Sequence, residues 1–231
     1  MTPHKERAAG LAFIPVFATI GFYALPLNWQ TPFAIQFTPQ LIAYLALSVW
    51  ACRNVGRLVK LGLSFDNIQP GIFWGTITGI SLGTMNTGII LYALPALEMD
   101  ISFLSKTPHA QIPFWIMAPW FIIVIAMAVE LNFRGFVLGR LLVFFDDVLQ
   151  TAHPSVMRNL MQVILPLGIS ALTFSFDPFL VTTFRHLHWI AVWDGLIWGW
   201  MWMKMHNLYA IMTAHAVEVV MIYLIIRGIL E

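Results

Sequence analysis

Ionisable side chains lie inside apolar stretches of this sequence, where they could carry out acid–base chemistry. The segment AMAVELNFRG holds Glu130 and, four residues later, Arg134. The segment TAHAVEVVMIY holds His215 and Glu218, three residues apart. A charge inside a lipid bilayer costs at least about 2.5–3.5 kcal/mol, so such residues usually face the protein interior and often mark a functional site. These residues are therefore candidates for an intramembrane site.

Glu130 and Arg134 have a structural explanation as well as a functional one. A carboxylate four residues before a guanidinium is the order that favours an ion pair along one helix face. Such a pair could hold helices together without a third partner. For a single histidine within a membrane, a hydrogen bond between helices is likewise the simpler interpretation. A third segment, FRHLHWI, also supplies histidines. Three separate segments with ionisable groups favour a shared site instead.

Histidines occur in two of these segments. His215 and Glu218 share a face of a predicted helix, and an imidazole can accept a proton near neutral pH or bind a metal. In FRHLHWI, His186 and His188 would project about 200° apart on a helix. Only one of these two histidines could therefore face a common centre.

The composition indicates which elements position these residues. The chain has 231 residues, of which 59% are hydrophobic and 10% are charged, whereas a typical soluble domain is about a quarter charged. Long apolar stretches with few charges predict membrane-spanning helices. A net charge of +1 without a basic tract gives no indication of nucleic-acid binding. The single cysteine, Cys52, excludes an intramolecular disulfide.

We predict an all-α polytopic membrane bundle of about seven or eight helices around a buried polar cavity. Residues 1–70 would supply two transmembrane helices, the first retained and not cleaved as a signal peptide, and a connector with a short interfacial helix. Residues 71–231 would form the helical core. A break or re-entry is expected near Gly135, because the apolar tract from Phe114 is too long for one straight span. The predicted helices cover residues 8–28, 33–52, 71–96, 114–145, 159–176, 179–193, 195–205 and 207–229, with a polar connection at 146–158.

Small and capping residues predict two local features. Gly75, Gly79 and Gly83 recur every four residues, which makes a small-residue face for close helix packing. Asp177 directly before Pro178 is typical of a helix start, with the aspartate as the cap and the proline in the first turn.

The distribution of cations predicts the orientation of the N-terminal half. Cytoplasmic loops of membrane proteins carry an excess of Lys and Arg. We therefore expect the N-terminus and the 53–69 connector to face the cytoplasm, in a plasma or inner membrane whose lipid surrounds the helices. The cations concerned are Lys5, Arg7, Arg53, Arg57 and Lys60.

The order and spacing of the candidate residues resemble the motifs of the CPBP family, the CAAX prenyl endopeptidases and bacteriocin-processing proteins. The family's motifs are EExxxR, commonly continued by FRG, then FxxxH, then HxxxN. This sequence has ELNFRG from Glu130, FRHLH from Phe184 to His188, and HA at His215. The segments 61–79 and 195–216 are also similar to the corresponding parts of the family.

The resemblance implies an intramembrane endopeptidase whose CPBP-like core surrounds a polar cavity, without a cofactor or metal. His188 would help to orient a water molecule, and His215 would stabilise the oxyanion. If the chain is active, we predict that Arg134 holds Glu130 in place and that the general base is Glu130 or Glu218. The implied substrates are membrane-associated peptides or prenylated C-termini.

The sequence departs from the family pattern at two positions. Val129 takes the place of the first glutamate, which carries the base role, and Val219 takes the place of the asparagine. Valine has no hydrogen-bonding group on its side chain. We therefore expect proteolysis by the family's route to be impaired or lost.

Three alternatives follow, and whether the chain is an enzyme differs among them. The chain could keep the fold without proteolysis, as a scaffold or as the binding subunit for a membrane-associated peptide or protein. It could be a hydrolase with relocated groups, in which Glu218 and Asn132 exchange the missing roles or a local helix bulge moves Glu130. It could instead bind a metal or pigment through His188, His215 and Glu218, with or without Glu130.

Overall fold

The computed structural model of the chain describes residues 6–107, 110–149 and 156–230, which form helices and the turns between them, without a strand in these ranges. The all-α prediction is confirmed for this part of the chain. Two compact units are present: Met1–Gly62 with Leu131–His206 form unit 1, and Leu63–Glu130 with Asn207–Glu231 form unit 2. The predicted division into residues 1–70 and 71–231 stays a prediction.

Several helices have the length and apolar composition of membrane spans. Among the described residues, four qualify, and a pair of helices bent by 55° would make a fifth. Many large apolar side chains on these helices are exposed, including Leu45, Phe73 and Trp120, as contact with lipid requires. The helices therefore indicate an integral membrane protein. The four are Phe33–Arg53, Arg57–Ala96, Phe114–Leu149 and Leu208–Ile229, and the bent pair is Leu160–Ser175 with Pro178–Met205.

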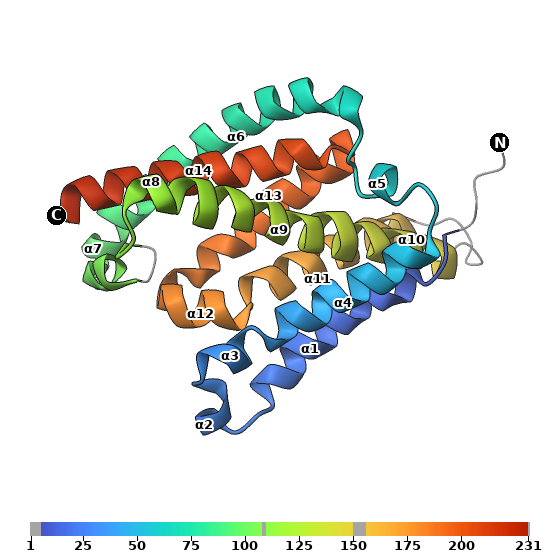
Figure 1. Cartoon of the computed structure of the whole chain (residues 1–231), viewed down its shortest axis with the longest axis horizontal. Coiled ribbons are helices and arrows are strands. Elements are labelled where there is room, and N and C mark those ends of the chain that lie inside the picture. The colour runs from blue at the N-terminus through green and yellow to red at the C-terminus, as the bar shows by residue number, and fades with distance from the viewer. Residues whose placement is uncertain (1–5, 108–109, 150–155, 231) are drawn as a thin grey trace. The chain divides into compact units, whose positions relative to one another are not determined.

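Unit 2 is built on two long helices, α6 (Ile68–Gly88) and α14 (Leu208–Leu230), which lie side by side and run parallel (Figure 1). Their backbones approach closely because α6 presents glycine to α14. A Cβ atom added at Gly79 would lie 2.6 Å from the carbonyl oxygen of Ala214 and 2.8 Å from Cβ of Val217. The predicted small-residue packing face is confirmed. The other glycines of this face are Gly71, Gly75 and Gly83.

The apolar tract from Phe114 to Leu149 is one continuous helical run, so the expected break near Gly135 is wrong. Two π-helical stretches, Met117–Val124 and Leu131–Leu138, are present instead. A π-turn keeps the backbone hydrogen-bonded, whereas a break within lipid would leave unpaired N–H and C=O groups that cost several kcal/mol each. The α-helical parts of the run are α8 (Phe114–Ile116), α9 (Ile125–Glu130) and α10 (Gly139–Leu149).

Unit 1 contains the N-terminal helices and the bent pair. Helices α11 (Val156–Ser175) and α13 (Ile190–Met205) pack against each other in opposite directions, since Gly195 faces Ala171 and Gly199 faces Leu167. Helices α1 (Phe13–Tyr23) and α4 (Thr38–Arg53) lie side by side (Figure 1). The N-terminal elements are α1 (Phe13–Tyr23), α2 (Leu27–Gln30), α3 (Phe33–Gln36), α4 (Thr38–Arg53) and α5 (Arg57–Lys60).

The predicted helices at 179–193 and 195–205 are wrong in their boundaries. Helix α12 (Pro178–Phe184) is short, and a 3-10 turn over Arg185–Trp189 separates it from α13. Arg185 has a φ of 49°, a conformation in which an α-helix of L-residues does not continue. Apolar periodicity continues across this turn, which is why the sequence pattern does not reveal it.

The predicted start of α12 is confirmed. Oδ1 of Asp177 accepts hydrogen bonds from the backbone N–H groups of Phe179, at 3.1 Å, and Leu180, at 3.2 Å. Pro178 occupies the first turn, where its missing N–H is not needed. The other carboxylate oxygen accepts from Nε2 of Gln40 at 2.9 Å, which ties α12 to α4.

The 53–69 connector contains the short helix predicted there, the single turn α5, and the position of this helix at the lipid interface stays a prediction. Of the predicted polar connection at 146–158, the ends belong to α10 and α11, and residues 150–155 lie outside the described residues. Lys5, one of the cations used to predict orientation, also lies outside them, and the orientation stays a prediction.

Candidate functional site

A buried carboxylate and an imidazole meet inside unit 2. Glu130 is the last residue of α9, and its side chain is fully buried. Its Oε1 lies 2.7 Å from Nδ1 of His215 on α14, although 85 residues separate the two in sequence. The His215 side chain is 13% exposed. The imidazole thus lies between the buried carboxylate and less enclosed surroundings, with its Nδ1–H donating to Glu130.

A second buried pair lies one helical turn further along α14. Nδ2 of Asn86 on α6 donates a hydrogen bond to Oε1 of Glu218 at 2.6 Å, and both side chains are buried. Because the two helices approach each other closely, the short side chain of Asn86 reaches Glu218. A Cβ atom added at Gly83, one turn before Asn86, would lie 3.4 Å from Cα of Glu218.

The two pairs bring polar groups from two helices, α9 and α6, to a third helix, α14. His215 is bound from α9, and Glu218 is bound from α6. A carboxylate behind an imidazole fixes its tautomer and stabilises the ring when it is protonated. A buried carboxylate that accepts from an amide is held in one orientation. We call Asn86, Glu130, His215 and Glu218 the polar cluster of unit 2.

The helical backbone changes directly after Glu130. Helix α9 ends there, and the π-helical stretch Leu131–Leu138 follows. A π-turn adds a residue to the helical turn and changes the direction in which neighbouring side chains point, and such turns are frequent at functional sites. A π-helical stretch thus follows Glu130, and the movement of Glu130 into the place of the missing glutamate stays a prediction.

Arg134 lies in unit 1, fully buried between aromatic rings. Its Cζ is 4.3 Å from the ring centroid of Phe174 and 5.1 Å from that of Trp198. Cation–π contacts of this kind are worth about 2 kcal/mol or more when they are desolvated. Gly195 leaves room for the guanidinium, because a Cβ there would lie 3.3 Å from Nη2 of Arg134. The predicted ion pair of Arg134 with Glu130 stays a prediction.

His188 also belongs to unit 1, on the 3-10 turn that follows α12. Its Nδ1 lies 2.5 Å from the carbonyl oxygen of Arg185, and its ring packs against Phe176 with 5.4 Å between the centroids. His186 lies on the same 3-10 turn and not on an α-helix. The predicted role of His188 in orienting water stays a prediction.

Val129 on α9 and Val219 on α14, which replace the family's glutamate and asparagine, are half-buried. The amide that binds Glu218 comes from Asn86, whereas Asn132 is buried in unit 1. Sequence reasoning missed Asn86 because it lies in the Gly- and Thr-rich stretch whose pattern indicates packing. The signal that could have found it was an amide within an apolar span, where Asn side chains hydrogen-bond to neighbouring helices.

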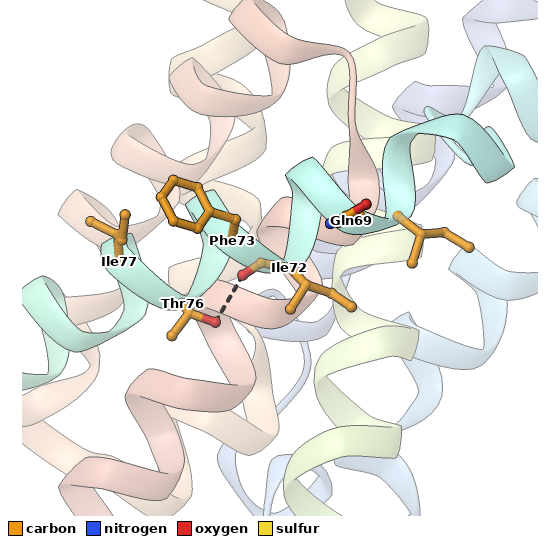
Figure 2. A pocket seen from close by; sticks show the side chains of 6 residues that line it. Gln69, Ile72, Phe73, Thr76 and Ile77 are labelled. Carbon is orange, nitrogen blue, oxygen red and sulfur yellow. Dashed lines mark hydrogen bonds between the residues drawn. The ribbon is translucent and has the colours of Figure 1, made fainter.

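A hollow on the surface of α6 is not part of the polar cluster (Figure 2). It has a volume of about 540 Å³, and side chains of the first turns of α6 line it. Its threonine hydroxyl, on Thr76, donates to the carbonyl oxygen of Ile72 in its own helix at 2.8 Å. This apolar surface fits contact with lipid. The lining residues are Ile68, Gln69, Ile72, Phe73, Thr76 and Ile77.

The predicted metal site has no matching arrangement in the described ranges, and the pigment site stays a prediction. Within these ranges, no group of three or more His, Cys, Asp or Glu side chains is placed to hold a metal ion.

Comparison of the chain with protein-family models, curated proteins and solved structures finds no match. The resemblance to the CPBP family therefore depends on the three short motifs and on the looser similarity of segments 61–79 and 195–216.

Proposed function

We propose that the chain is an integral membrane protein of the CPBP type that hydrolyses a peptide bond within or beside the bilayer, with the polar cluster as its reaction centre. The observation that supports this most is the 2.7 Å contact between Glu130 and His215. These residues belong to two different motifs of the resemblance, and they come together in the interior of one unit.

The Glu130–His215 pair is suited to stabilising a negative charge. Glu130 accepts the Nδ1–H of His215 and stabilises the ring when Nε2 also carries a proton. The Nε2–H group can then donate to the oxygen of a peptide carbonyl as that oxygen becomes negative. Because Glu130 is fully buried, water does not compete for this contact.

The proposed substrates are membrane-associated peptides, including segments with a prenylated C-terminus. An intramembrane site is reached most directly by a substrate that is already in the bilayer. No residue of the polar cluster distinguishes one such peptide from another, so the substrate class follows from the resemblance and from the apolar helices that surround the cluster.

A second candidate function is a membrane scaffold or binding subunit that has lost proteolysis. The presence of Val129 and Val219 favours it, because the family's base and oxyanion asparagine are then absent. In this case the polar cluster would serve to bind a peptide or to join helices.

Peptide hydrolysis in proteoliposomes separates the two candidates. A panel of membrane-spanning and prenylated peptides is incubated with the wild-type protein, with His215→Ala, with Glu130→Gln and with Val129→Glu. We expect the wild-type protein to cleave at least one peptide. His215→Ala should reduce turnover by about 100-fold or more, as the loss of an oxyanion donor does. His206→Asn is the control, since His206 belongs to unit 1 and not to the polar cluster.

Turnover that appears only in Val129→Glu would support the scaffold. Wild-type turnover that His215→Ala and Glu130→Gln leave unchanged would reject the polar cluster as the reaction centre.

A further inference from the structure

The second pair of the polar cluster, Asn86 and Glu218, contains a carboxylate that can take the role of the glutamate absent at position 129. Val129 cannot act as a base, and Glu130 is bound to His215. We infer that Glu218 is the general base of this site and that Asn86 is the residue that positions it. This inference rests on the proposed function and assigns a role to Asn86, a residue outside the three motifs.

The position of Glu218 suits this role. It lies three residues after His215 on α14, so both side chains project from one face of the helix. A carbonyl whose oxygen approaches His215 can therefore lie next to a water molecule held by Glu218. Glu218 is buried, with 2% of its surface exposed, so that its carboxylate is shielded from bulk solvent.

Asn86 holds this carboxylate in a defined orientation. Its Nδ2–H donates to Oε1 of Glu218 at 2.6 Å, from a side chain that is itself fully buried. An amide donor stabilises the ionised form of the carboxylate, which is the form that accepts a proton. It binds Oε1, and we assign the proton of the water to the second oxygen, Oε2.

The reaction step balances with these groups alone. Oε2 of Glu218 takes one proton from water while the water oxygen bonds to the peptide carbonyl carbon. The π electrons of the carbonyl move to its oxygen, which accepts a hydrogen bond from Nε2–H of His215. When the carbonyl re-forms, the C–N bond breaks and Glu218 returns its proton to the leaving nitrogen. The net change is the addition of one water molecule to the peptide bond.

Asn86 and Glu218 also have a simpler explanation, a hydrogen bond that joins two membrane helices. The two explanations differ in what a repositioned carboxylate does. If Glu218 only joins helices, a glutamate at position 129 cannot compensate for its loss. If Glu218 is the base, a glutamate at position 129 can take over that role. A helix contact also has no reason to change kcat while KM stays constant.

The test measures kcat and KM in proteoliposomes for Glu218→Gln, Asn86→Ala, Thr87→Val and the double variant Glu218→Gln with Val129→Glu. We expect kcat to fall about 100-fold or more in Glu218→Gln, in the range that general bases contribute. Asn86→Ala should lower kcat about tenfold with KM unchanged. The double variant should recover at least about tenfold of the lost kcat. Thr87→Val is the matched control, because Thr87 is the next buried residue of the same helix.

Each outcome bears on a separate claim. Unchanged kcat in Glu218→Gln, together with loss in His215→Ala, would overturn this inference and leave the proposed function in place. No recovery in the double variant would reject Glu218 as the base that replaces the one absent at position 129. Wild-type kcat in Asn86→Ala would reject the positioning role, and Asn86→Leu repeats this arm if the alanine variant does not melt cooperatively. No hydrolysis by the wild-type protein would overturn both proposals.

Discussion

The stability of the polar cluster depends on pairing at the level of single residues. Glu130 is fully buried, and an uncompensated carboxylate in such surroundings is costly. Its contact with His215 offsets this cost. The free energy of unfolding should therefore fall most when one member of the pair is removed without the other.

Removing one member of the Glu130–His215 pair should destabilise the protein more than removing both. We expect His215→Leu alone to cost about 3–5 kcal/mol, because it leaves a buried carboxylate without its imidazole. Adding Glu130→Met should recover part of this loss, since no buried charge then remains at that position. Unfolding in mixed detergent micelles measures His215→Leu, Glu130→Met and the double variant. A loss in the double variant equal to the sum of the losses in the two single variants would show that the pair is not coupled.

His206 is a titratable residue outside the membrane spans, at the end of α13. Its Nε2–H donates to the carbonyl oxygen of Val59 at 3.2 Å, and its ring lies 4.7 Å from that of Trp202. Partial desolvation lowers the pKa of His206 below its ordinary value of 6.5. The positive charge of Arg140 also lowers this pKa, whereas the hydrogen bond to Val59 opposes the shift.

Unit 1 should therefore lose stability in mild acid through His206. A lowered pKa in the folded state means that the unfolded chain binds the proton more readily, so this contribution is present above about pH 6.5 and is lost as the pH falls through the folded-state pKa. We expect His206→Asn to weaken the pH dependence of the melting temperature between about pH 7.5 and about pH 5.5. Asparagine tolerates the positive φ of 47° at this position. An identical pH dependence in both proteins would contradict the assignment.

At the scale of elements, the contact of α6 with α14 positions the cluster. The Asn86 amide reaches Glu218 because the glycine face lets the helices approach. Without a hydrophobic driving force between helices in lipid, such close packing and interhelical hydrogen bonds hold the pair together. A larger side chain on this face should separate the helices and the polar pair with them.

Gly79→Ala should therefore destabilise unit 2, whereas Gly88→Ala should not. The new Cβ at position 79 would lie 2.6 Å from the Ala214 carbonyl oxygen, a backbone atom that cannot move aside cheaply. Overpacking of this kind typically costs about 1–3 kcal/mol. At Gly88, on the same helix, nothing lies within 4 Å of an added Cβ. Thermal melting in detergent compares the two variants. Equal melting temperatures would reject close packing at Gly79.

Helices could be predicted from the sequence better than their interruptions. The apolar tracts and the glycine repeat predict the spans and the packing of α6, and Asp177 with Pro178 predicts the start of α12. The 3-10 turn at Arg185–Trp189 and the π-helical stretch after Glu130 have no counterpart in apolar periodicity. They arise from backbone geometry that only tertiary contacts select.

At the scale of the whole molecule, the length and apolar composition of the helices indicate an integral membrane protein. Exposed apolar side chains follow these helices, and buried polar side chains gather inside each unit. In unit 2 this interior holds the polar cluster, and in unit 1 it holds Arg134 among aromatic rings. Polar groups thus avoid the surface that the lipid would cover.

The sequence predicts part of the candidate site and not the rest, for a physical reason. The cost of burying a charge in lipid is enough to single out Glu130, His215 and Glu218 by residue type and apolar context. It does not say which of them pair, because 85 residues separate Glu130 from His215. Asn86 is uncharged, so the cost of burying a charge does not identify it. Partners such as Glu218 and Asn86 become visible only when the helices are packed.

The meeting of α9 and α14 at Glu130 and His215 is tested most directly by cross-linking in membranes. With Cys52, the single cysteine, replaced by serine, cysteines are introduced at positions 130 and 215 and treated with a short thiol-reactive cross-linker. Ile125 supplies the control pair with position 215, because it is exposed and lies about 140° around α9 from Glu130. Rapid cross-linking of 130 with 215, and little of 125 with 215, is the predicted result. Equal rates for both pairs, or none for 130 with 215, would contradict the account.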